Sequence, residues 1–251
     1  MTLVLIIVGL ILIAMAIGLF YAALSTQRKT AAMSALATSS AGSVISLYSG
    51  EPAEVRGTLR CESPLTSEFA GEPCAYFSTQ LTREYEEQER DSDGRTRWNR
   101  KSESIASSTQ RVGFTVEDET GAVRVDPEGA DIDALQVVNR FEQDHAGGIT
   151  IGGVSIDLGL GTVSGRRILG YRSTEHVLRL DSPVYVIGVV NEEKDIASAP
   201  AGMKDRPFII SYRSEEALKS AWQDSARWLR RGSMACCAIG VLLLLSAAIW
   251  R

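Results

Sequence analysis

Charged side chains are missing from both ends of this 251-residue chain. Neither residues 3–24 nor residues 232–250 contain Asp, Glu, Lys or Arg. An uncharged run of about 20 apolar residues can cross the roughly 30 Å hydrocarbon core of a bilayer as a helix. A cleaved signal peptide would have a positive flank and a shorter apolar region, so a retained anchor is favoured over a leader for the first run. The sequence therefore predicts two transmembrane helices, 1–24 and 232–251.

An excess of positive charge is also missing. The chain holds 26 Lys and Arg against 31 Asp and Glu, a formal net charge of −5. Nucleic-acid binding needs clustered cations to neutralise phosphates, so we expect no nucleic-acid partner.

Sequence motifs of nucleotide binding and of common catalytic sites are lacking as well. The glycine-rich stretch 145–166 has no Lys-Ser/Thr pair of a P-loop and no surrounding strand–turn–helix. No Gly-x-Ser-x-Gly elbow and no His-Glu-x-x-His motif occurs. We therefore expect no nucleotide and no cofactor, and the stretch is interpreted as a twisted β-ribbon with Ile149, Ile151, Val154 and Ile156 on its apolar side.

Cysteine is scarce, with four residues in the chain. Cys236 and Cys237 fall within the second apolar run, which leaves Cys61 and Cys74 in the polar region. Two separate thiols and a disulfide in an oxidising compartment both fit the sequence. Neither cysteine has a neighbouring histidine that could activate it as a nucleophile.

The other candidate ligands are few and scattered. Histidine occurs twice, as His145 beside Asp144 and His176 beside Glu175, and both are interpreted as surface residues. The acidic turn that contains Asp126, Glu128, Asp131 and Asp133 lacks the twelve-residue calcium-loop pattern, which favours a solvated turn. The sequence thus predicts no catalytic, cofactor-binding or metal-binding residue.

Basic residues flank the two apolar runs on the inner side of each. They are Arg28, Lys29, Arg227, Arg230 and Arg231. The positive-inside rule therefore favours a two-pass integral membrane protein with its polar region in the cytoplasm, although the rule is weaker for a long loop and the opposite orientation stays open.

The polar region divides by composition into three parts. Residues 25–48 are rich in Ala, Ser and Thr and are interpreted as a helical neck. Residues 49–212 carry β-type alternation and turn residues. Residues 213–231 predict an amphipathic helix, with Ser214 as its cap and Leu218, Trp222, Ser225 and Leu229 on one stripe.

The β-type segments are short and separated by Gly and Asp turns. The predicted strands cover 54–60, 74–85, 113–118, 122–126, 132–141, 177–180, 184–190 and 207–212. This pattern predicts a mostly antiparallel barrel- or sandwich-like domain, and hence a membrane-anchored α+β protein.

A charged hairpin is predicted around the turn Asp91-Ser92-Asp93-Gly94. Asp-Gly supplies the positive φ that tight hairpins need, and the arms 82–89 and 95–102 are highly charged. We expect this hairpin to project into water. The segment 83–101 is the predicted contact surface for a partner, with a merely solvated arm as the alternative.

The region from Ser49 onward resembles a known family in its ordered motifs. The residues that carry the resemblance are Gly50, Glu51, Pro52, Gly57, Pro64, Leu65, Gly71, Glu72, Pro73, Cys74, Tyr76, Asp118, Gly121, Asp126, Pro127 and Gly188. They resemble the GIDE or BAM ("beside a membrane") domain of the mitochondrial membrane-anchored E3 ubiquitin ligases called MULAN or MAPL, over roughly residues 45–250. The resemblance implies two membrane helices around the domain, and it implies a non-cytosolic side for the domain, against the basic flanks.

One part of that family pattern departs from this sequence. The ligase activity of the family resides in a C-terminal RING finger, which holds two zinc ions with eight Cys or His ligands. The sequence has four Cys and two His, and no residues after Arg251. We therefore expect the anchoring or sensing half of the family without its catalytic half.

Two functions follow as expectations. The first is a non-catalytic, membrane-tethered scaffold or sensor of GIDE type, from a prokaryote, that touches the bilayer and a protein partner or a second copy. The second is the membrane component of an E3 ubiquitin-ligase-like or stress-response system whose catalysis another protein supplies. A membrane hydrolase with an unfamiliar site is a third, less favoured reading.

Overall fold

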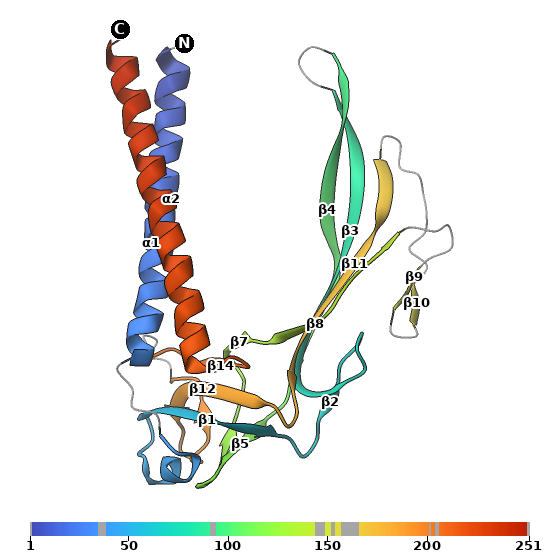
Figure 1. The fold of residues 1–251 in the computed structure, drawn as a ribbon, viewed down its shortest axis with the longest axis vertical. Helices are drawn as coiled ribbons and strands as arrows, with labels where there is room; N and C mark the ends of the chain where they lie inside the picture. The colour runs from blue at the N-terminus through green and yellow to red at the C-terminus, as the bar shows by residue number, and fades with distance from the viewer. Residues whose placement is uncertain are drawn as a thin grey trace.

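A computed structural model describes residues 2–34, 39–90, 94–143, 149–151, 154–156, 166–200, 202–203 and 206–249. It contains two long terminal helices, a curled β-sheet and a long β-arm (Figure 1). The helices leave the curled sheet together and end with the two chain termini close to each other at the far end of the molecule (Figure 1). The arm rises from the sheet in the same general direction.

The terminal helices are α1 (Thr2–Ser34) and α2 (Glu215–Ile249). Each is one continuous helix that contains both the uncharged run and the polar residues next to it. The predicted amphipathic helix 213–231 is therefore the first half of α2. The predicted neck is in part the continuation of α1 to Ser34, followed later by a 3₁₀ helix η1 (Ala41–Ser46).

The curled sheet contains seven strands in the order β1, β5, β6, β13, β12, β14, β7. Their bounds are β1 (Pro52–Arg60), β5 (Phe114–Asp118), β6 (Gly121–Val125), β7 (Asp131–Asp133), β12 (Pro183–Val190), β13 (Ile196–Ala197) and β14 (Ile209–Ser211). An additional antiparallel pairing of β1 with β12 closes the path β1–β5–β6–β13–β12 on itself. The barrel- or sandwich-like prediction is thus confirmed in its coarser form, a β-rich fold with a curled sheet.

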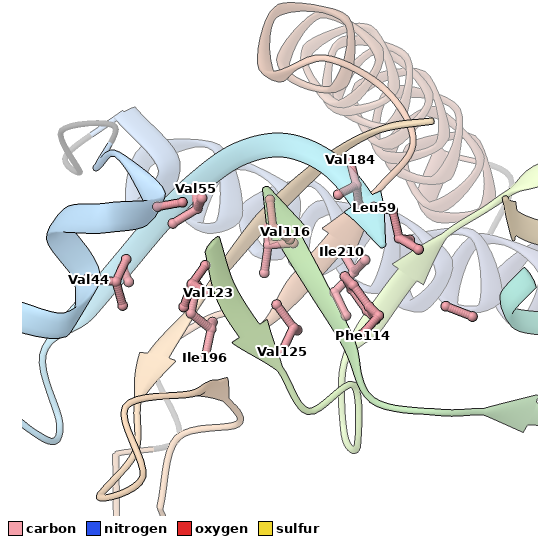
Figure 2. Packing of buried hydrophobic residues seen from close by; sticks show 14 of the residues in the cluster. Val44, Val55, Leu59, Phe114, Val116, Val123, Val125, Val184, Ile196 and Ile210 are labelled. Atoms are coloured by element: carbon pink, nitrogen blue, oxygen red, sulfur yellow. The ribbon is translucent and has the colours of Figure 1, made fainter. Parts of the chain in front are cut away.

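The main core fills the inside of this curled sheet. Phe114, Val116 and Val125 from the β5–β6 hairpin point toward Val184 and Ile210 on the strands across from them (Figure 2). Strand β12 is buried at every position after Pro183, as expected for a central strand without polar–apolar alternation. Burial of this apolar surface supplies the main stabilisation of the domain.

The second sheet forms the arm. It consists of β3 (Pro73–Arg90) paired with β4 (Thr96–Arg111) on one side and β11 (Arg166–Arg179) on the other, with β8 (Leu135–Gln143) beyond β11. The short β2 (Leu65–Thr66) pairs with the first residues of β3. Glu89 lies opposite Arg97, which confirms the pairing of the two arms of the predicted hairpin, while residues 91–93 of its turn lie outside the described part of the chain.

Two strand predictions were wrong in extent. The predicted strand 132–141 is two strands, β7 and β8, which belong to different sheets, because the chain crosses from the curled sheet to the arm at Ala134. The predicted strand 177–180 is the end of the much longer β11, whose charged first half is stabilised by pairing with β3. Of the stretch 145–166 expected to form a β-ribbon, the structure describes β9 (Ile149–Ile151) paired with β10 (Val154–Ile156), and the residues between these strands, those around them and the expected apolar side lie outside the described part.

Candidate functional site: the helix hairpin and the charged arm

Small residues line the seam where α1 and α2 pack against each other. On α1 the buried positions Gly9, Ala16 and Ala23 recur every seven residues. On α2 the buried positions Ala226, Ser233, Gly240 and Ala247 do the same. A seven-residue repeat keeps one face of a helix against its partner, so both helices present a continuous small-residue stripe to each other.

The closest approach lies at Gly9 and Gly240. A Cβ atom on Gly240 would lie 3.1 Å from the carbonyl oxygen of Gly9 and 3.0 Å from Ile13. A Cβ on Gly9 would lie 3.0 Å from Leu244. In lipid, burial of apolar surface does not favour helix association, and small residues that let backbones approach closely do. This packing suits a helix pair that works inside a membrane.

The remaining surface of the helix pair is apolar and exposed. Leu10, Ile11, Leu242 and Leu245 are each more than half exposed. By length and composition, Ile6–Leu24 within α1 and Glu215–Ala247 within α2 are able to cross a bilayer. The two helices are therefore compatible with a two-pass membrane protein, and the geometry leaves the orientation untested.

The basic flanks lie on these helices. Arg227, Arg230 and Arg231 are exposed on α2 directly before its uncharged half. Arg28 and Lys29 belong to the last turns of α1, and their side chains lie outside the described part of the structure. The predicted stripe on α2 holds at Leu218, Trp222 and Leu229, but Ser225 is exposed and Ala226 is buried in its place, since the seam follows the seven-residue repeat.

The first turn of α2 is fixed to the curled sheet. Ser214 Oγ accepts a 3.3 Å hydrogen bond from the Ala217 N–H, so it caps the helix as predicted. Arg56 of β1 forms ion pairs with Glu215 and Glu216 at 3.2 and 3.3 Å. Leu218 is buried against Tyr185, Ile187 and Ile209. The start of α2 is therefore packed against the curled sheet and ion-paired to it.

A buried tyrosine lies under the same junction. Tyr185 is completely buried, and burial, reinforced by the neighbouring carboxylates Glu54 and Glu215, raises the pKa of its hydroxyl above the ordinary value. Tyr185 is therefore neutral at physiological pH.

Ion pairs cross the arm from strand to strand. Glu84 of β3 accepts hydrogen bonds from Arg100 of β4 and from Arg172 of β11, the latter at 2.8 Å. The hydrogen bond from Arg100 is the main reason that the pKa of Glu84 is lowered. Glu87 is shared in the same way by Lys101 at 2.8 Å and Arg166 at 2.7 Å. These bridges stabilise a sheet whose apolar contacts are two small clusters, one around Cys74, Phe77 and Val177 and one around Leu81 and Tyr171.

Strand β4 forms an edge of the arm. Within the described part of the chain, β3 pairs along one side of β4 and no strand pairs along the other. Its side chains are all exposed or partly exposed, including Trp98 at 51%. The strand carries four cations, Arg97, Arg100, Lys101 and Arg111, and one carboxylate, Glu103. An exposed edge with free backbone groups is a ready template for another extended chain.

Two of the residues that carry the family resemblance, Asp118 and Glu72, connect one part of the fold to another. Asp118 accepts hydrogen bonds from the N–H groups of Ala41 at 2.7 Å and Thr120 at 2.7 Å, and thereby holds η1 against the β5–β6 turn. Glu72 binds Arg179 through two hydrogen bonds of 2.6 and 2.8 Å. Both side chains already have structural partners.

The remaining motif residues divide between turns and strands. Gly50, Gly71 and Gly121 have positive φ, a conformation that glycine adopts at turns, and so does the nearby Gly129. Gly57 and Gly188 do not. A Cβ on Gly57 would lie 2.4 Å from the carbonyl oxygen of Glu117, and one on Gly188 would lie 2.6 Å from Ile196. These two glycines are needed for the close packing of neighbouring strands. Glu51, Pro52, Pro64, Leu65, Pro73, Asp126 and Pro127 lie at or beside strand ends.

The cysteines of the polar region are free thiols in the structure. Cys74 is buried beside Phe77 and Val177, and burial raises its pKa to about 11. Cys61 is partly exposed, and Tyr76 packs half-buried against the main core. His176 is half-buried in β11, whereas His145 and Asp144 lie outside the described residues.

The members of the acidic turn have separate neighbours. Asp133 accepts a 2.7 Å hydrogen bond from Ser211 and pairs with Arg213 at 3.3 Å. Asp126 accepts a hydrogen bond from the Glu128 N–H at 3.2 Å. Among the described residues, no three His, Cys, Asp or Glu side chains gather as metal ligands.

The fold and site define a β-rich domain carried on a hairpin of two apolar helices. The family model whose description is "E3 Ubiquitin ligase", GIDE, matches residues 83–245. The chain therefore belongs to the GIDE family. The motifs between residues 49 and 77 lie before the matched range.

One curated relative is E3 ubiquitin-protein ligase SPL1 from Arabidopsis thaliana. It is 25% identical over 190 residues, which cover 76% of this chain and 54% of the relative. The chain thus spans about half the length of that protein. No solved structure matches the chain.

Proposed function

We propose that this chain is a non-catalytic, membrane-tethered binding domain of GIDE type. The helix pair holds the domain at one face of a bilayer, and the small-residue seam between α1 and α2 is the observation that carries the proposal. Small residues let two helices pack closely in lipid, where the hydrophobic effect does not drive their association. The junction of Arg56 with Glu215 and Glu216 then sets the position of the domain relative to the membrane.

The contact surface in this proposal is the outer edge of β4. Four cations on the strand against one carboxylate favour an acidic, extended segment of a protein partner, which would compete with Glu84 and Glu87 for Arg100 and Lys101. Backbone hydrogen bonds to the edge would supply affinity, and the arginines would select charge. The ion pairs across the arm support this role, because they hold β3 and β11 rigid behind the edge.

A second candidate function follows from the family. The chain would be the membrane component of an E3 ubiquitin-ligase-like system, with the transfer step supplied by another protein. The family match and the SPL1 relative support a relation to ligases. In this version the partner bound by the arm is either the catalytic protein or its substrate.

Quantitative co-purification tests the binding role. The full chain is purified in detergent from its native membrane, as wild type and as Arg97→Glu. The matched control is Arg140→Glu, an exposed arginine on β8 at the opposite edge of the same sheet. The proposal expects a stoichiometric partner with wild type and control and its loss with Arg97→Glu. Recovery of the wild type without any partner would contradict it, and a RING-bearing or ubiquitin-like partner would favour the second version.

A further inference from the structure

An aromatic and basic ring surrounds the helix pair at one level. Gly232 of α2 lies beside Leu19 of α1, since a Cβ on Gly232 would be 3.8 Å from Leu19. The antiparallel helices therefore bring the residues after Leu19 level with those before Gly232. We call this ring the collar, and it consists of Phe20, Tyr21, Arg227, Trp228, Arg230 and Arg231.

The collar marks the boundary between two kinds of helix surface. On one side of it, residues 232–250 of α2 are uncharged. On the other side, α2 carries Glu215, Glu216, Lys219 and Asp224. If the uncharged half lies in hydrocarbon, the collar lies at the level of the lipid headgroups.

The collar side chains point away from the helix seam. Trp228 is 73% exposed, Tyr21 69% and Phe20 47%. A tryptophan so exposed is unfavourable in water but is stabilised at a membrane interface, where its ring is in an apolar layer and its N–H is wet.

The cations of the collar exceed its nearby carboxylates. Arg227 pairs with Asp224, one turn earlier on α2. Within the described part of the chain, neither Arg230 nor Arg231 forms a hydrogen bond or an ion pair, and both are exposed. The collar therefore carries more positive charge than the nearby carboxylate neutralises.

A shallow hollow of about 240 Å³ opens in the collar between Asp224, Arg227, Trp228 and Arg231. Two guanidinium groups, an indole ring and the Asp224 carboxylate line it, so a phosphate would share Arg227 with Asp224 and have Arg231 to itself. Arginine is the side chain best suited to binding phosphate oxygens. Exposed apolar residues of α2, among them Met234 and Leu242, continue from the collar toward the helix end. A ligand with a negatively charged head group and long apolar tails matches the basic hollow and the apolar surface that continues from it.

We propose that the collar is a binding site for an anionic phospholipid. Arg227 and Arg231 bind the phosphate oxygens, Arg230 adds positive charge, and Trp228 packs against the glycerol and upper acyl region. The acyl chains run along the exposed apolar flank of α2. This inference depends on the membrane tether proposed above, but not on the partner bound by the arm.

Lipid retention by the full chain tests the site. The protein is reconstituted in nanodiscs of equal phosphatidylglycerol and phosphatidylcholine, extracted gently and examined by native mass spectrometry. We expect phosphatidylglycerol to be retained preferentially. Arg230→Gln with Arg231→Gln should reduce that preference roughly 25-fold, since each arginine near a membrane surface favours an anionic lipid about five-fold.

The matched control removes the same charge elsewhere. Arg124→Gln with Arg140→Gln, both on the β-domain and about 70% exposed, should leave the preference unchanged. Equal retention of the two lipids, or a preference that survives the collar substitutions, would overturn the site. A fall with the control pair as large as with the collar pair would overturn it too, because general charge would then explain the preference. Failure of the chain to enter nanodiscs would instead contradict the membrane tether.

Discussion

Gly9 and Gly240 face each other across the two terminal helices, so close that a Cβ atom at either position would be in tight contact with the partner helix. A Cβ on Gly240 would lie 3.1 Å from the carbonyl oxygen of Gly9. Ala16, Ala23, Ala226, Ser233 and Ala247 extend this contact along the whole pair. The two helices, more than 200 residues apart in sequence, are thereby joined into one hairpin.

Enlarging the closest contact should separate the helices. Gly240→Leu is expected to destabilise the protein by about 1–3 kcal/mol, because extra methylene groups in a packed seam force the backbones apart. Thermal unfolding in detergent micelles measures this as a lower Tm. Gly18→Leu is the control, since nothing lies within 4 Å of a Cβ there. Equal Tm values for the two variants would show that the seam does not hold the helices together.

The sequence predicted elements better than it predicted how they join. The hairpin around residues 91–94, the β5–β6 hairpin and the central β12 follow from turn residues and apolar patterns that act locally. The division of 132–141 between two sheets could not be read from the sequence, because Ile132 and Val137 look alike while tertiary pairing assigns them to different sheets. The seven-residue spacing of Gly9, Ala16 and Ala23 is visible in the sequence and indicates a helix–helix contact. A hydropathy profile does not reveal it. The β4 edge could be anticipated only as a charged hairpin, since the sheet behind it forms when β11, far along the chain, pairs with the other side of β3.

Removing the Asp118 carboxylate should loosen η1. Asp118→Asn loses acceptor strength toward Ala41 and Thr120, and we expect a loss of about 1 kcal/mol, or roughly 2–4 °C in Tm, at neutral pH. The hydrogen bond from the Ala41 N–H is the main cause that lowers the pKa of Asp118 in the folded protein below the ordinary 3.8. A lowered folded pKa contributes stability above the unfolded pKa, and that stability is lost as pH falls through the folded value.

The difference between wild type and Asp118→Asn should therefore persist from neutral pH to about pH 5 and shrink below pH 4. Tm measured across this range checks the sign. A gap that grows toward low pH would contradict the role assigned to the carboxylate.

Gly57 tests the close packing of β1 on β5. Gly57→Ala places a Cβ 2.4 Å from the carbonyl oxygen of Glu117, a backbone atom that cannot move away alone. We expect a loss of about 1–3 kcal/mol in denaturant unfolding. Gly113→Ala serves as the comparison, because the nearest atom to its Cβ is at 3.6 Å, an ordinary contact. Wild-type stability of Gly57→Ala would contradict the packing explanation.

The two thiols should differ in reactivity. Because burial raises the pKa of Cys74 to about 11, little thiolate forms at pH 8, and maleimide should label Cys61 first. Peptide mapping after a timed reaction measures the labelling rates of both thiols. In the Cys61→Ser variant, the labelling of Cys74 is measured without that of Cys61. Faster labelling of Cys74 would contradict its burial in the folded domain.

A bilayer around the two helices would require the arm to move. In the structure its outer end rises to the level of the uncharged halves of α1 and α2 (Figure 1). Each arginine or acidic residue placed in hydrocarbon would cost about 2.5–3.5 kcal/mol or more, and the arm carries many. The arm should therefore swing away from the helices, toward the plane of the membrane surface.

Distances between spin labels at Asn99 and Leu242 report this movement. In liposomes the distance should be longer than in the structure, while a control pair at Asn99 and Ser108 within the arm should be unchanged. An unchanged Asn99–Leu242 distance would mean that hydrocarbon does not surround the helix pair.

The most direct test of the membrane hairpin is the environment of α2 on the two sides of the collar. Single spin labels are placed at Leu242 and at Gln223, both exposed in the structure, in the full chain reconstituted into liposomes with its native cysteines replaced. Oxygen concentrates in hydrocarbon and a nickel chelate stays in water. The account predicts that Leu242 is accessible to oxygen and shielded from nickel, and that Gln223 shows the reverse. Nickel access at both positions would contradict it, because the two helices would then form a hairpin in water.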